Sequence, residues 1–176
     1  MYYFISDLHL GHFNIIRYCK RPFETLQQMD LTLIRNWNTR IQDEDTVFFL
    51  GDFCMKKSSE APEGKTYEYY RKQLKGNIIF ITGNHDKNNG TKSIIESMVI
   101  KYGGQRIYLT HNPQFAKKEF AINFVGHVHE KWKFRQMDNS KTVMINLGVE
   151  NWKYMPVTIN EIFSELAQWR KAGKKC

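Results

Sequence analysis

The stretch that decides the fold reads Asn77-Ile78-Ile79-Phe80-Ile81-Thr82-Gly83-Asn84-His85-Asp86. Its apolar first half has the composition of a buried strand, and it passes directly into polar residues able to bind a metal ion. Other strand-type runs end in the same way, in Ile5-Ser6-Asp7-Leu8-His9, Leu50-Gly51-Asp52, Leu109-Thr110-His111-Asn112 and Val125-Gly126-His127-Val128-His129. Because open α/β sheets bind ligands beyond the carboxyl ends of their strands, we expect these segments to meet at one site.

Hydrophobic periodicity predicts an α/β order in the first half of the chain and mainly strands in the second half. The expected strands are 2–6, 46–50, 77–82, 98–102, 106–110, 122–125, 142–147 and 155–159. Three- and four-residue spacing of apolar side chains predicts helices over 24–40, 66–75 and 161–171. Polar residues and helix breakers mark residues 55–65 and 86–92 as surface connections.

Length and composition bound the class of protein. A chain of 176 residues with 41% hydrophobic and 25% charged residues predicts a single domain spanning 1–176, with a basic tail from about 170 to 176. This composition excludes a disordered or fibrous chain, and the apolar runs are too short for a membrane span. We therefore expect a soluble protein with no membrane partner.

Charge and cysteine content add two weaker expectations. The formal net charge of +8 favours contact with polyanions, but it serves solubility or a phosphate-bearing small substrate equally well. The N-terminus carries no export signal, and Cys19, Cys54 and Cys176 lack the spacing of a disulfide framework. We expect a cytoplasmic protein whose cysteines act as small apolar residues.

The histidines indicate a metal centre. All six of them lie in or beside the strand-end segments. In Asp7-x-His9 and in His127-x-His129, the period of two along a strand directs both side chains to one side. The oxygen and nitrogen donors, with no thiolate among them, suit two divalent ions that share a carboxylate. Two such ions can hold a phosphoryl oxygen and activate a water for in-line displacement, which predicts phosphoester hydrolysis.

Five ordered motifs, Asp-x-His, Gly-Asp, Gly-Asn-His-Asp, a lone His and Gly-His-x-His, resemble those of the calcineurin-like metallophosphoesterases. The resemblance spans residues 7–129 and is closest to small bacterial or phage-type members. It implies a four-layer α/β/β/α sandwich, in which two central mixed sheets are flanked by helices and the metal centre lies at their strand ends.

The resemblance also implies roles for individual residues. Asp7, His9 and His129 would bind the first ion, Asn84, His111 and His127 the second, and Asp52 would bridge them. His85 would not be a ligand; it would protonate the leaving oxygen or stabilise the phosphoryl group, with Asp86 orienting it. An imidazole beside a carboxylate titrates near neutral pH, which fits this role.

One departure from the family pattern bears on the substrate. Protein phosphatases of this superfamily continue Gly-Asp into a segment whose arginine clamps the phosphate, whereas Gly51-Asp52 runs here into Phe-Cys-Met-Lys-Lys. Lys56 or Lys57 could replace that arginine electrostatically. Without the clamp for a dianionic phosphate, a phosphodiester is favoured over a monoester.

Several neighbouring residues are candidates for substrate contact. His12 either contacts a substrate phosphate, or it caps the following helix or bonds a carboxylate behind the metal ligands. Asn84 could contact substrate besides binding metal. Asn14, Arg17 and Arg21 are expected at the solvated surface, with a phosphate contact as the alternative for Arg17.

The segment 146–152 and the aromatic residues leave further alternatives open. Asn146 could order a metal ligand, Gly148 could permit a tight turn, and Trp152 is expected in the core. The aromatic residues of the chain are expected mainly in the core, with a base-stacking platform as the alternative. The residues considered are Tyr67, Tyr69, Tyr70, Phe115, Phe120, Trp132 and Phe134.

The sequence thus predicts a dinuclear metal-dependent phosphoesterase acting on a phosphodiester, with a nucleotide or nucleic-acid-derived substrate as an option. Mn²⁺ is the favoured ion, and Fe, Zn²⁺ or Ni²⁺ also suit these ligands. The alternatives are a phosphomonoesterase acting on a small substrate and a basic nucleic-acid-binding module whose metals are structural. An intact ligand set together with His85 argues against the binding module. The sequence makes no prediction of the oligomeric state.

Overall fold

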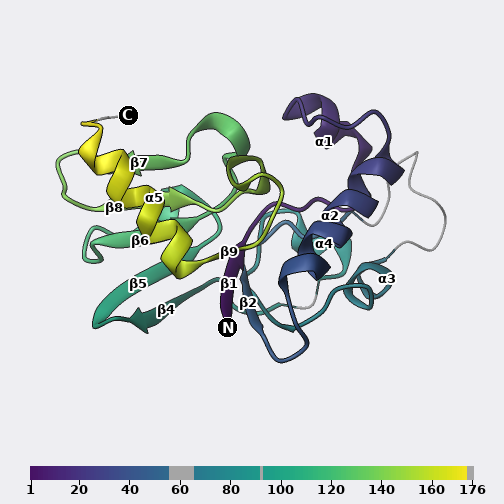
Figure 1. Ribbon diagram of the computed structural model, residues 1–176, viewed down its shortest axis with the longest axis horizontal. Helices are drawn as coiled ribbons and strands as arrows, with labels where there is room; N and C mark the ends of the chain where they lie inside the picture. The colour runs from purple at the N-terminus through teal and green to yellow at the C-terminus, as the bar shows by residue number, and fades with distance from the viewer. Residues whose placement is uncertain (56–65, 92, 174–176) are drawn as a thin grey trace.

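The computed structural model describes residues 1–55, 66–91 and 93–173, in which helices separate the first four strands and strands predominate from there to the final helix (Figure 1). The strands are β1 (Tyr2–Ile5), β2 (Thr46–Phe49), β3 (Asn77–Phe80), β4 (Ser97–Tyr102), β5 (Gln105–Thr110), β6 (Ile122–Val125), β7 (Phe134–Gln136), β8 (Val143–Asn146) and β9 (Val157–Thr158). The helices are α1 (Phe13–Tyr18), α2 (Leu26–Arg40), α3 (Tyr67–Arg71), α4 (Asp86–Asn89) and α5 (Ile159–Lys171), with 3-10 turns η1 (Pro113–Phe115), η2 (His129–Lys131) and η3 (Val149–Trp152).

The strands form two mixed sheets. The first has the order β3-β2-β1-β9, in which β1, β2 and β3 are parallel and β9 is antiparallel to β1. The second has the order β4-β5-β6-β8-β7, in which β5, β6 and β8 are parallel and the two edge strands are antiparallel to their neighbours. The carboxyl ends of the parallel strands in each sheet therefore lie at one edge.

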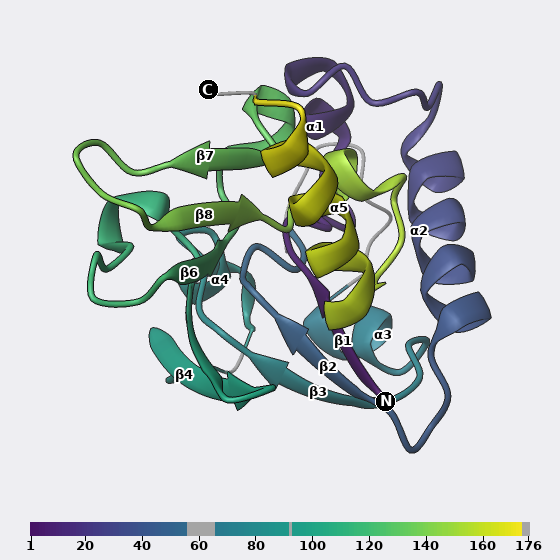
Figure 2. The ribbon, with the colours of Figure 1, turned by 60° about the vertical axis from the view of Figure 1, so that its left-hand side comes forward.

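Two apolar clusters hold these layers together. One side of the first sheet packs against α1, α2 and α3, through side chains such as Phe49 and Trp37. Its other side faces the second sheet, and this cluster joins Phe4 of β1 to Phe124 of β6 and to Ile162 of α5. Figure 2 shows α5 in front of the strands and α2 as a separate helix along the right-hand side.

The two long helices have clear start signals. Thr25 accepts a hydrogen bond from the Gln28 N–H at the start of α2. Thr158 and Glu161 form a reciprocal capping box at the start of α5. Such contacts satisfy backbone N–H groups that have no partner inside the helix.

The predicted fold class, two mixed sheets with flanking helices, is confirmed. Each expected strand is present within a few residues, but β7 was not predicted. The expected helix over 66–75 is shorter in the structure, where α3 spans Tyr67–Arg71. Part of the connection expected at 86–92 is helical, because α4 spans Asp86–Asn89. Within the described ranges no helix is long and apolar enough to cross a membrane.

Candidate metal centre

The strand ends of both sheets meet through backbone hydrogen bonds. After β1, the Ser6 N–H donates to the Leu147 carbonyl at 2.9 Å, which ties the first sheet to the segment that follows β8. The Asp7 N–H donates to the Gly51 carbonyl at 3.0 Å, which ties the segments after β1 and β2. The segments that the sequence singled out therefore share one region.

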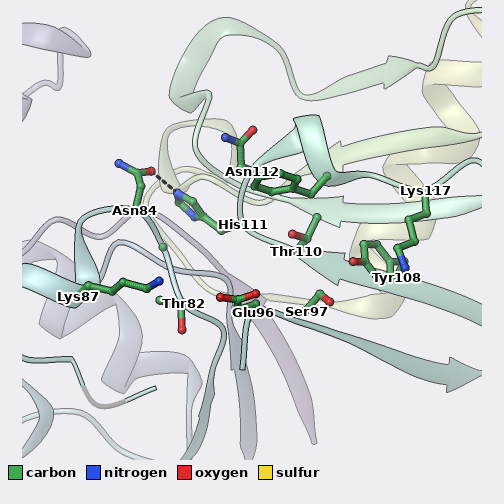
Figure 3. A pocket seen from close by; sticks show the side chains of 12 residues that line it. Thr82, Asn84, Lys87, Glu96, Ser97, Tyr108, Thr110, His111, Asn112 and Lys117 are labelled. Atoms are coloured by element: carbon green, nitrogen blue, oxygen red, sulfur yellow. Dashed lines mark hydrogen bonds between the residues drawn. The ribbon is translucent and has the colours of Figure 1, made fainter. Parts of the chain in front are cut away.

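Two clusters of potential ligands lie in this region. In each cluster the ligand atoms are within 4.8 Å of one another. The first consists of Asp7, His9 and His129, and the second of Asp52, His111 and His127. The side chain of Asn84 joins the second cluster, since its Oδ1 lies 3.0 Å from His111 Nε2 and 2.8 Å from His127 Nδ1 (Figure 3).

Asp52 belongs to the second cluster and also faces the first. Its Oδ2 is 3.6 Å from Nε2 of His9 in the first cluster and 3.3 Å from Nε2 of His111 in the second. The structure thus brings together all seven residues expected as ligands and gives Asp52 the central place. That these residues bind metal stays a prediction.

The donor set fits cations better than it fits internal hydrogen bonds. The ring of His9 is buried, with 2% of the residue exposed, and its Nε2 has no hydrogen-bond partner among the described residues. His111 Nδ1 lies 2.6 Å from the Leu50 carbonyl, and its Nε2 faces oxygens of Asn84 and Asp52. With Nδ1–H donating to Leu50, the oxygens at Nε2 are satisfied either by a second ring proton, as in the metal-free chain, or by a cation that takes the place of that proton and accepts a lone pair from each of these atoms.

The acidic groups of the site are shifted in opposite directions. Burial raises the pKa of Asp7, which is 0% exposed. Burial also opposes ionisation of Asp52, but the hydrogen bond and positive charge of His111 outweigh it and hold the pKa of Asp52 below its usual value. The same contact, together with the charge of Asp7, overcomes burial and raises the pKa of His111 to about 9. Burial keeps the pKa of His9 well below its usual value.

The backbone at this centre is strained. Among the described non-glycine residues, positive φ values occur at five expected ligands, namely Asp7 (60°), His9 (51°), Asp52 (61°), His127 (72°) and His129 (51°). This region of φ is sparsely populated, although Asp and His enter it more readily than most residues. Such strain gathers at functional sites, where the surrounding contacts over-determine the geometry.

His85 lies beside the first cluster and is exposed. Its ring centroid is 5.4 Å from that of His9, and its backbone N–H donates to Asp52 Oδ1 at 2.9 Å. The buried carboxylate of Asp86 accepts hydrogen bonds from the N–H groups of Asp52 (2.9 Å), Phe53 (3.0 Å) and Gly83 (2.7 Å). The prediction that Asp86 orients the His85 side chain is therefore wrong: Asp86 fixes the turn that carries Asp52.

The candidate substrate contacts divide into near and distant residues. The ring centroid of His12 is 5.5 Å from that of His9, and His12 occupies the cap position of α1 without a side-chain cap hydrogen bond, so the capping alternative is wrong. Arg17 and Asn14 are exposed, as expected. The expectation of a solvated Arg21 is wrong, because this residue is 4% exposed and beneath the site. Lys56 and Lys57 lie outside the described residues.

The segment after β8 supports His129. Asn146 Nδ2 donates to the His129 carbonyl at 2.6 Å, so Asn146 orders a candidate ligand through its backbone. Trp152 is in the core, as expected. Glu150 was not predicted, yet its Oε1 lies 3.0 Å from His129 Nδ1. Cys19 is also within 4.8 Å of these two residues.

A cavity of about 640 Å³ opens beside the second cluster (Figure 3). Asn84 and His111 form one end of it, and Tyr108 and Lys117 line the other. Phe115, one of the aromatic residues weighed as core or stacking platform, also lines the cavity and is 66% exposed.

Comparison with known proteins agrees with this geometry. Residues 2–159 match the calcineurin-like phosphoesterase superfamily domain. The uncharacterized protein MJ1445 of Methanocaldococcus jannaschii is 38% identical over 166 residues, which cover 91% of this chain and 88% of that protein. The gene 66 protein of Mycobacterium phage L5 is 31% identical over 85 residues, or 48% of this chain and 39% of that protein.

A solved structure shows the same fold. The protein of unknown function AQ665 from Aquifex aeolicus superposes with a TM-score of 0.69 at 25% identity, covering 93% of this chain and 98% of that chain. The chain therefore belongs to the calcineurin-like phosphoesterase superfamily and is a metal-dependent phosphoesterase.

Proposed function

We propose that the chain is a dinuclear phosphodiesterase whose two divalent ions share Asp52. The observation that carries this proposal is the place of Asp52, whose Oδ2 faces Nε2 of His9 and Nε2 of His111 at 3.6 and 3.3 Å. A carboxylate between two sets of nitrogen and oxygen donors is suited to bridging two cations.

Each ion has its own set of residues in this proposal. Asp7, His9 and His129 hold the first ion, and Asn84, His111 and His127 hold the second. When bound, the two ions supply Lewis-acid polarisation of the phosphoryl group and activation of a water. The donors suit Mn²⁺ first, and Fe, Zn²⁺ or Ni²⁺ as well.

His85 acts on the leaving group in this proposal. Its imidazole is exposed beside the first cluster, and its backbone N–H is anchored on Asp52. This placement supports transfer of a proton from the ring to the departing ester oxygen. His12, whose ring centroid is 6.5 Å from that of His85, is placed to contact the same phosphate. Arg17 is exposed on α1, and in this proposal it contacts only longer substrates.

The cavity beside the second cluster supports a diester substrate. A phosphodiester has a second ester arm that stays on the phosphate, and the cavity is lined by Asn84 and His111 but by no residue of the first cluster. Lys87 and Lys117 bring positive charge to its wall, and the exposed ring of Phe115 offers a stacking face. These features favour a retained arm that is a nucleoside, in a nucleotide or a nucleic-acid end.

The first experiment compares bis-p-nitrophenyl phosphate with p-nitrophenyl phosphate, in Mn²⁺ and in chelator. We expect metal-dependent turnover that favours the diester, and two ions per chain by elemental analysis. Asp52→Asn should abolish turnover, while Asp43→Asn, a matched change at an exposed aspartate, should not. Preference for the monoester would overturn the diester assignment, and a single bound ion would overturn the dinuclear one.

A second pair of esters tests the retained arm. Thymidine 5′-p-nitrophenyl phosphate and methyl p-nitrophenyl phosphate share a leaving group and differ in the arm that stays. We expect Phe115→Ala to lower kcat/KM for the thymidine ester about tenfold, because stacking contributes about 1–3 kcal/mol per base. The methyl ester should be unaffected, and Tyr102→Ala, at an exposed aromatic residue that does not line this cavity, should change neither. Equal losses for both esters would refute the stacking role of Phe115.

A further inference from the structure

Arg21 is a buried cation that holds the turn carrying two candidate ligands. Its side chain is 0% exposed. Nη2 donates to the Asp7 carbonyl at 2.7 Å, and Nη1 donates to the Leu8 carbonyl at 2.8 Å. Along the backbone, these two carbonyls lie between the Cα atoms of Asp7 and His9. The guanidinium therefore fixes the backbone from which both project.

Glu150 compensates this charge and extends the contact to a third ligand. Its Oε1 accepts hydrogen bonds from Arg21 Nε at 3.0 Å and from Arg21 Nη2 at 2.7 Å. The same oxygen lies 3.0 Å from His129 Nδ1. A carboxylate on one ring nitrogen fixes the orientation of an imidazole and leaves the other nitrogen for a metal ion. The Glu150 side chain is only 4% exposed, so solvent does not weaken these contacts.

The pair acts where the backbone is strained. Asp7, His9 and His129 have φ values of 60°, 51° and 51°, and such strained backbone persists only where the surrounding contacts hold it. Arg21 holds the first two through the backbone, and Glu150 holds the third through its ring. One ion pair thus reaches all three side chains of the first cluster.

The second cluster is held differently. The Nδ1 of His111 faces the uncharged Leu50 carbonyl at 2.6 Å, and the contact of His127 Nδ1, at 2.8 Å, is to Asn84, which is itself a proposed ligand. The carboxylate that His111 faces at 3.3 Å is that of Asp52, itself a proposed ligand, and among the described residues no ion pair from outside the ligand set contacts either imidazole. The two clusters therefore differ in what orients their ligands.

We propose that Arg21 and Glu150 are positioning residues for the first metal ion and give that site a higher affinity than the second. The inference rests on the proposed dinuclear function. Neither residue is a ligand in this proposal; both act through Asp7, His9 and His129. Loss of the pair should weaken the first site selectively, because the second cluster has its own contacts.

Titration of the full-length, metal-free chain with Mn²⁺ in a calorimeter tests this inference. The variants are Glu150→Gln, which keeps the shape but removes the charge, and Arg21→Lys, which removes the planar fork. Arg40 and Glu161 provide the matched control, since they also pair at 2.7 Å but lie on the surface between α2 and α5. Arg40→Lys and Glu161→Gln should leave both Mn²⁺ affinities unchanged.

We expect Glu150→Gln and Arg21→Lys to lower the affinity of the tighter Mn²⁺ site about 10- to 100-fold, which is the usual effect of losing a partner behind a metal ligand. The weaker site should change less than threefold, and far-UV circular dichroism should be retained. Wild-type affinity at both sites in a folded variant would overturn the inference. So would unfolding of both variants, because the pair would then be structural. If the wild-type chain binds only one ion, the dinuclear proposal fails, and the effect of Glu150→Gln on that ion still decides the inference.

Discussion

Replacement of Gly83 by alanine tests how closely the metal centre is packed. A Cβ atom at this position would lie 2.2 Å from Asp52 Oδ1 and 2.4 Å from the Asp52 backbone nitrogen. Ordinary contacts of a Cβ atom begin at 3.4 Å, so the backbone of residue 83 and Asp52 would have to move apart by about 1 Å. The Asp52 backbone N–H is itself fixed at 2.9 Å from the Asp86 carboxylate, which leaves the Asp52 turn little room to retreat.

The expected cost has two parts. Overpacking a well-filled site costs about 1–3 kcal/mol of folding free energy. In a protein of this size that corresponds to roughly 2–4 °C in Tm per kcal/mol. Displacement by about 1 Å of the carboxylate that we propose as the bridge should cost about 100-fold in kcat/KM. Binding of both ions should weaken, because Asp52 faces both clusters.

The assay measures diester turnover, Mn²⁺ binding and thermal unfolding on the same preparation. Gly90→Ala is the control, since Gly90 has a φ of +83° and its added Cβ would meet nothing within 4 Å. We expect Gly90→Ala to lose about 1 kcal/mol of stability through backbone strain while its metal affinity is retained. Wild-type Mn²⁺ binding and turnover in a folded Gly83→Ala variant would refute this reasoning about the position of Asp52.

Three further predictions concern single groups. His85→Ala should lower kcat for the diester by about 10²- to 10⁴-fold with both ions still bound, as loss of a general acid does, and an unchanged kcat would exclude that role. In the metal-free chain the pKa of His111 is raised to about 9 and that of His129 to about 10, so their contribution to stability is complete below about pH 6.5 and lost as the pH rises through those values. Mn²⁺ binds the unprotonated rings, so the stabilisation by Mn²⁺, measured as the difference in Tm with and without the ion, should grow between about pH 6.5 and about pH 9. A difference in Tm that does not change with pH would contradict this. Burial and the charge of Asp86 raise the pKa of Cys54 to about 12, so a thiol reagent should label it, as judged by mass spectrometry, only after unfolding; labelling at the unfolded rate would contradict its burial.

The strand ends could be predicted because their signals are local. In the stretch 77–86 an apolar run passes into Gly-Asn-His-Asp, and the structure places β3 and then Asn84 and His85 there. The five spaced motifs placed the other candidate ligands in the same way. The direction of each side chain could not be predicted from the strand period of two, because Asp7, His9, His127 and His129 lie beyond the ends of β1 and β6 and have positive φ values.

Contacts between distant segments could not be predicted in this way. Arg21 and Glu150 are 129 positions apart, and each has the composition of an ordinary surface residue. Arginine and glutamate are rarely buried unless paired, so burial of either depends on a partner that only the fold brings near. The error on Asp86 has a related cause. The prediction paired it with its neighbour His85, whereas its carboxylate satisfies backbone N–H groups of Asp52 and Phe53, more than thirty positions away.

These distant contacts explain why the strained ligands hold their places. Positive φ at a non-glycine residue is costly, and the strain at Asp7 and Asp52 must be offset by bonds that the relaxed backbone would lose. Arg21 provides such a bond for Asp7, because it is buried and donates to the Asp7 carbonyl. Asp86 provides them for Asp52 by binding its backbone N–H. Because Arg21 and Asp86 are not candidate ligands, contacts from outside the ligand set hold part of the geometry of this centre.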